Sequence, residues 1–150
     1  GSLQTFAEAR ARGEGRAADG PAFLRFFQRY AGHHHHAREE AVLFPALIRE
    51  TDAPAQRGPI ATLLEDHRAI AALLDALAPP LEGEGDAALL PARAARYGEA
   101  LLHHIDAENH VLFPEAARRY VRAMAHSDVA ADPHQACEHT NSTRPPPPLA

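Results

Sequence analysis

The chain has 150 residues, a formal net charge of −5 at neutral pH, eleven histidines and a single cysteine, Cys137. This length favours one domain with a hydrophobic core, and one cysteine cannot form an internal disulfide. The negative charge argues against nucleic acid as a main partner, because such binding needs a clustered basic face. We find no signal-peptide segment and no apolar run near about 18 residues, so we expect no membrane association and a cytoplasmic location.

β-Branched residues are scarce while Ala, Leu, Arg and Glu dominate, so the sequence predicts an all-α fold. The expected helices cover, in chain order, residues 3–12, about 21–50, 60–78 and about 87–113, with 114–126 continuing the last one beyond a kink at Pro114. We expect the third helix to stop at Pro79-Pro80. Residues 1–131 are predicted to form one domain, and 132–150 a disordered proline-rich tail.

Two segments share the pattern His-x3-Glu-x3-Leu-Phe-Pro. The two copies are His35, Glu39, Leu43, Phe44 and Pro45, and His104, Glu108, Leu112, Phe113 and Pro114. In both copies a further histidine precedes the first one. This agreement is not expected by chance in so short a chain, so we interpret the segments as an internal repeat.

Residues four apart lie on one face of a helix, so each copy presents an imidazole and a carboxylate toward one point. An isolated pair of this kind is more often solvated than functional. Here the pairs continue the apolar stripes of their helices, and we expect them to face the core. The stripes are Leu24, Phe27, Ala31, His35, Glu39, Val42 and Leu43, and Tyr97, Leu101, His104, Glu108, Val111 and Leu112. A metal ion would give both buried carboxylates a partner.

The third helix adds a histidine to this pattern. Its stripe is Ile60, Leu63, Leu64, His67, Ile70, Leu74 and Leu77. A lone histidine on an apolar face is more often a core residue than a ligand. Three antiparallel helices, however, bring their middle positions to one level, as in the di-metal carboxylate sites of helix bundles. Imidazole and carboxylate donors suit iron, manganese or zinc, and the absence of inward thiolates argues against a cysteine-type zinc site.

The segments 26–45, 58–68 and 102–114, which carry these histidines, resemble the hemerythrin-like HHE cation-binding family, and the resemblance covers about residues 22–120. It implies an up-and-down four-helix bundle that binds two irons, bridged by two carboxylates and capped by histidines. The metal ligands that the resemblance implies are His35, Glu39, His67, His104 and Glu108.

The family also supplies a histidine from the middle of its first helix, whereas this chain has none before His33. Residues 3–12 resemble only the end of that helix. We therefore expect a shortened first helix and an incomplete di-iron site, with fewer than two irons per chain. The uncovered apolar seam would be closed by residues 114–126 folding back or by a second chain. The histidines expected to flank the ligands, one of which could replace the missing donor, are His33, His34, His36 and His103.

For function, the resemblance implies a non-haem iron module that binds or senses O2, NO, peroxide or iron itself. One alternative is an enzyme that decomposes peroxide or carries out another oxidation at the same metals. Tyr97 is then the only candidate proton donor outside the ligands. Another alternative is a structural or interaction domain that the metal stabilises. We expect a small ligand as the partner and a monomer or homodimer as the assembly.

Overall fold

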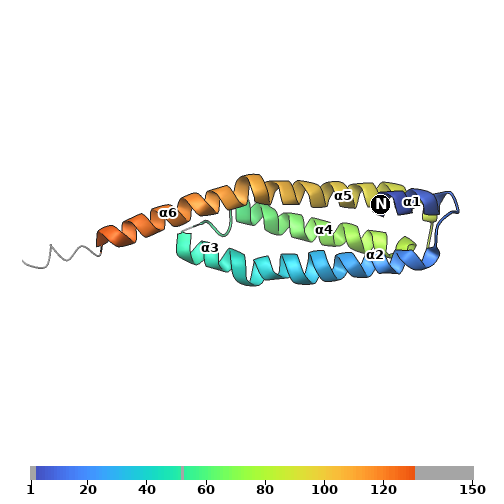
Figure 1. Cartoon of the computed structure of the whole chain (residues 1–150), viewed down its shortest axis with the longest axis horizontal. Coiled ribbons are helices and arrows are strands. Elements are labelled where there is room, and N and C mark those ends of the chain that lie inside the picture. Colours follow the sequence, from blue (N-terminus) through green and yellow to red (C-terminus); the bar gives the residue numbers. More distant parts are fainter. Residues whose placement is uncertain (1–2, 52, 131–150) are drawn as a thin grey trace, which may run out of the picture.

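The computed structural model describes residues 3–51 and 53–130, and within them it contains helices and turns but no strand (Figure 1). The α-helices are α1 (Leu3–Ala11), α2 (Gly20–Phe27), α3 (Phe44–Thr51), α4 (Pro59–Leu81), α5 (Leu90–Ala107) and α6 (Phe113–Ala130). The π-helical segments are η2 (Gln28–His36), η3 (Glu39–Leu43) and η5 (Glu108–Leu112), and short 3-10 helices are η1 (Ala17–Asp19) and η4 (Ala87–Leu89). The predicted proline-rich tail lies outside the described residues.

These segments join into an antiparallel helical bundle. Figure 1 shows α2 continuing into α3 along one side and α5 continuing into α6 along the other, with α4 between them. α4 packs against both α5 and α2, α3 packs against α6, and α1 lies on α5. The expected all-α bundle is therefore confirmed, and its first helix has only nine residues. No described helix is long and apolar enough to cross a membrane.

α4 continues through Pro79 and Pro80 to Leu81, so the expectation that it stops before the prolines was wrong. The end of the helix is determined by Gly83, which has a φ of 86°. After this glycine the chain turns back, and the N–H of Glu84 donates to the carbonyl of Pro79 at 2.8 Å. This arrangement satisfies a carbonyl that the helix end would otherwise leave free.

Both copies of the repeat contain a π-helical turn at the same place. η3 and η5 each begin at the glutamate of their copy and end immediately before Phe-Pro. A proline lacks an N–H and its ring clashes with the carbonyl four residues earlier. A wider turn accommodates the proline without ending the helix, which explains why α3 and α6 simply continue the preceding segments.

The π turns also change which side chains face the core. Phe44, the residue after the first wide turn and five positions after the buried Glu39, is 2% exposed. Val42 and Val111, which we expected in the apolar stripes, are instead 61% and 49% exposed. The error arose because the stripes were drawn with α-helical spacing, and one wider turn rotates the positions that follow around the helix axis.

Two apolar clusters fill the bundle on either side of a polar layer. The cluster near α1 contains Leu3, Ala7, Leu24, Ile70, Leu74, Leu77, Leu81, Leu90, Ala94 and Tyr97. The cluster near α3 and α6 contains Phe44, Ile60, Leu63 and Leu112. Along α4 the residue that separates the two clusters is His67, which is itself 4% exposed. Burial of the apolar residues stabilises the bundle and holds the polar layer between them.

Part of the apolar surface beside α1 is open among the described residues. A groove of about 950 Å³ runs between α2 and α5 from the start of α1, and its walls include Phe23, Phe26, Leu101 and Leu102. The alternative in which residues 114–126 fold back over this seam was wrong. α6 extends away from the groove and packs on α3 (Figure 1), because the π turn lets the helix run on through its proline.

Replacing Gly20 with alanine is expected to destabilise the bundle by roughly 1–3 kcal/mol. A methyl group at Gly20 would overlap the backbone carbonyl of Leu81, where α2 and the end of α4 touch. Thermal unfolding should show a lower melting temperature. Gly98 on α5 provides the matched control, because a methyl group there meets no atom within 4 Å. Gly98→Ala should stabilise the helix by about 0.5–1 kcal/mol, and equal melting of both variants would contradict the predicted clash.

Candidate metal centre

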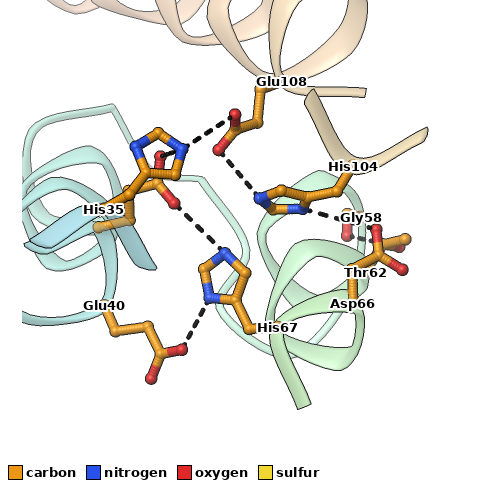
Figure 2. A network of polar contacts seen from close by, with 9 residues as sticks. His35, Glu40, Gly58, Thr62, Asp66, His67, His104 and Glu108 are labelled. Atoms are coloured by element: carbon orange, nitrogen blue, oxygen red, sulfur yellow. Dashed lines mark hydrogen bonds and ion pairs between the residues drawn. The ribbon is translucent and has the colours of Figure 1, made fainter. Parts of the chain in front are cut away.

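The five residues that the sequence singled out come together in the polar layer. They come from three helical rods: the continuous run from α2 to α3, the helix α4, and the continuous run from α5 to α6. The first rod carries His35 in η2 and Glu39 in η3. The second carries His67, and the third carries His104 in α5 and Glu108 in η5. In Figure 2 the three rings and the carboxylate of Glu108 point toward one another. The bundle therefore places both copies of the repeat, and the histidine of α4, around one point.

The distances within this cluster are short. Nε2 of His35 lies 3.6 Å from Glu39 Oε1 and 3.5 Å from Glu108 Oε2. Nε2 of His104 lies 3.3 Å from Glu108 Oε1, and Nε2 of His67 lies 3.3 Å from Glu39 Oε2. One ligand atom each of His35, Glu39, His104 and Glu108 can be chosen so that all four lie within 4.8 Å of one another.

Most of these polar atoms are buried and have no hydrogen-bond partner among the described residues. They include Glu39 Oε2, His67 Nε2, His104 Nε2 and Glu108 Oε1. Buried polar atoms are normally hydrogen-bonded, so a group of buried nitrogen and oxygen atoms that face one point without partners needs an explanation. A cation among them would give each a partner, and the donor set of imidazoles and carboxylates is one that transition metals accept.

Two further carboxylates lie behind the histidine rings. Glu40 Oε1 is 2.7 Å from His67 Nδ1, and Asp66 Oδ2 is 3.9 Å from His104 Nδ1 (Figure 2). Only Glu40 is close enough for a hydrogen bond, and its carboxylate on the outer nitrogen of His67 selects the tautomer that leaves the inner nitrogen free to bind a metal. The side chain of Glu40 is 47% exposed, but its carboxylate contacts the ring of His67.

The cluster shifts the pKa values of its members. Burial by itself would raise the pKa of the Glu108 carboxyl, but contacts with His104, Glu39 and His35 hold it well below its usual range. Burial likewise opposes the charged form of His67, but contacts with Glu39 and Glu40 raise its pKa above the ordinary value. A proton therefore competes with a cation for His67, and cation binding should release protons.

His36, one of the four histidines expected to flank the ligands or to replace the missing donor, also lies in the centre. It is 7% exposed, whereas the side chain of His35, expected in the core, is 43% exposed at the edge of the cluster. The run of four histidines was visible in the sequence, but which of them faces inward depends on the width of the helical turn. His33 and His34 are exposed, as expected for residues that flank the site.

Tyr97, the candidate proton donor, is 1% exposed and belongs to the apolar cluster near α1. Its ring packs edge-on against Phe27, with the centroids 5.0 Å apart, and its hydroxyl has no hydrogen-bond partner among the described residues. Burial raises the pKa of Tyr97 to about 12. The hydroxyl is therefore protonated at neutral pH.

An all-α bundle with imidazoles and carboxylates converging in its core is the architecture of a cation-binding helical domain. A comparison with protein families agrees with this class: the family described as "Hemerythrin HHE cation binding domain" matches residues 3–116. The chain belongs to this family. Comparisons with curated proteins and with solved structures found no match.

Proposed function

We propose that this cation-binding domain holds iron at a di-iron site, with fewer than two irons per chain, and uses it to bind or sense a small ligand such as O2, NO or peroxide, or to respond to iron itself. Its proposed ligands are His35, Glu39, His67, His104 and Glu108. The observation that carries the proposal is the convergence of buried, unpartnered nitrogen and oxygen atoms from three helical rods on one point. Manganese or zinc could occupy the same donor set.

Two carboxylates between three imidazoles suit a pair of cations better than one. Glu39 contacts both His35 and His67, and Glu108 contacts both His35 and His104. Each carboxylate has two oxygens, so each can serve two metal positions at once. The negative charges of Glu39 and Glu108, which are 6% and 3% exposed, also need positive partners, and two cations would provide them.

The surroundings of the centre favour a small exogenous ligand. A cavity of about 910 Å³ opens between η2 and α4, and its walls include Ala31, Gly32, Ala71, His36 and Tyr97. Small side chains on its walls leave space beside the metal-site histidines. Bound iron would supply redox chemistry and an exchangeable coordination position, while the apolar clusters on both sides limit the access of water.

Purified protein from iron-replete cells tests the proposal. Metal analysis should find at least one iron per chain, and the visible absorption of the anaerobically reduced protein should change when O2 or NO is added. Iron and manganese well below one equivalent, with zinc absent, would contradict a metal centre. Peroxide turnover without reversible ligand binding would favour the enzyme instead. A metal that changes only the melting temperature would favour a structural role.

A further inference from the structure

His36 lies inside the bundle because the helix that carries it has a wide turn. In η2 the successive buried residues Ala31 and His36 are five positions apart, a spacing typical of a π-helix. Regular α-helical spacing from Ala31 would bring His35 to the same face instead. The wide turn therefore places two adjacent histidines at one centre, one at its edge and one inside.

The second copy of the repeat shows the effect of the turn by contrast. The position that corresponds to His36 is Ile105, in the regular α-helix α5. Ile105 is 39% exposed, although the preceding His104 is fully buried. The inward position of His36 is thus a local feature of η2 and not a general consequence of the repeat.

The surroundings of His36 are those of a metal-site histidine. Its ring stacks on His67, with the centroids 4.1 Å apart and 14° between the planes, and its centroid lies 4.9 Å from that of His104. One ring nitrogen each of His35, His36 and His104 can be chosen within 4.8 Å of one another. Nε2 of His36 is buried and has no hydrogen-bond partner among the described residues. A buried ring nitrogen without a hydrogen-bond partner is costly, and a cation would provide that partner.

We propose that His36 is an additional metal ligand, so that four imidazoles and two carboxylates share the centre. This inference rests on the proposed metal site and extends its donor set by a residue whose position depends on the π-helical turn. The competing interpretation is that His36 is only a packing residue, which keeps the ring of His67 in place by stacking.

Cobalt(II) titration of the metal-free protein distinguishes the two roles, because the visible absorption of bound cobalt depends on the number and type of its donors. His36→Phe keeps an aromatic ring against His67 but removes both nitrogens. We expect this variant to bind cobalt at least about 100-fold more weakly at one position, a larger loss than a residue outside the coordination sphere causes. The matched control is His34→Phe, an exposed residue of the same segment, which should behave like the parent.

The outcomes separate this inference from the proposed function. If His36→Phe binds cobalt with the affinity, stoichiometry and spectrum of the parent, His36 is a packing residue and the inference is wrong, while the metal centre stands. If the parent itself binds neither cobalt nor iron, the proposed function fails and the inference fails with it. Equal losses in His36→Phe and His36→Ala, with unchanged melting of the metal-free proteins, support a ligand.

A measurement on the parent alone keeps the inference testable if the variants do not fold. Protein labelled with 15N in its histidine rings is titrated with zinc(II), and the ring resonances are assigned. A coordinated nitrogen of His36 should shift strongly as zinc binds, together with those of His67 and His104. A ring resonance of His36 that keeps its metal-free position in the zinc-saturated protein would overturn the proposal.

Discussion

Glu108→Ala and Glu39→Ala are each expected to weaken metal binding by more than about 100-fold, beyond the loss caused by residues that only support a ligand. Each carboxylate is buried and contacts two histidines from different segments of the bundle. Removing one therefore takes away a shared donor and leaves the remaining cation charge less neutralised. Metal content after purification, followed by competition with a chelator of known affinity, measures the effect.

Two glutamates provide graded controls for these variants. Glu40 contacts only the outer nitrogen of His67, so Glu40→Ala should weaken binding by about 10–100-fold. Glu65 is exposed on α4, and Glu65→Ala should leave metal binding unchanged. Losses for Glu40→Ala as large as those for Glu39→Ala would show that Glu39 is not the inward ligand of its helix.

Removal of the metal is expected to lower the melting temperature of the parent on the order of 10 °C. The ligands come from three helical rods and converge only in the folded bundle, so the metal binds the folded state selectively. At a free metal concentration 1,000 times Kd, such binding contributes about 4 kcal/mol. In a chain of this size each kcal/mol changes the melting temperature by about 2–4 °C. Thermal unfolding with and without chelator measures the shift.

Glu39→Ala is the matched variant for this experiment, because it should hold little metal and melt almost equally with and without chelator. A parent whose melting temperature does not respond to the chelator would indicate a bundle that is stable by itself and holds metal only weakly. In that case the apolar clusters on both sides of the polar layer would account for the stability of the fold.

The regular helix α4 was the most predictable part of the molecule. Its apolar stripe was drawn with α-helical spacing, and Ile60, Leu63, His67, Ile70, Leu74 and Leu77 are all buried. The prediction succeeded because the local geometry is that of an undisturbed α-helix, in which spacing along the chain determines the exposed face. The repeat was equally informative, since His35, Glu39, His104 and Glu108 lie at one centre.

At the π-helical turns, part of the burial that we predicted from α-helical residue spacing was wrong. Val42 and Val111 were placed in the core and are exposed, and His36 was grouped with three flanking histidines, although it alone of the run from His33 to His36 is buried. In each case the error follows from a turn that is one residue wider than assumed. The prolines of the repeat are visible in the sequence, but whether a proline breaks, kinks or widens a helix depends on the packing of the helix around it.

The sequence by itself determined the helical class, the repeated His–Glu pairs and the histidine of α4, because these depend on composition and on spacing within single helices. Only the tertiary structure decided that His36 is buried while the adjacent His35 lies at the edge of the centre, and that Glu40 contacts the outer nitrogen of His67. It also decided that α6 packs on α3 and leaves the groove beside α1 open. These features depend on contacts between helices and on the width of single turns, and neither is encoded in the periodicity of one segment.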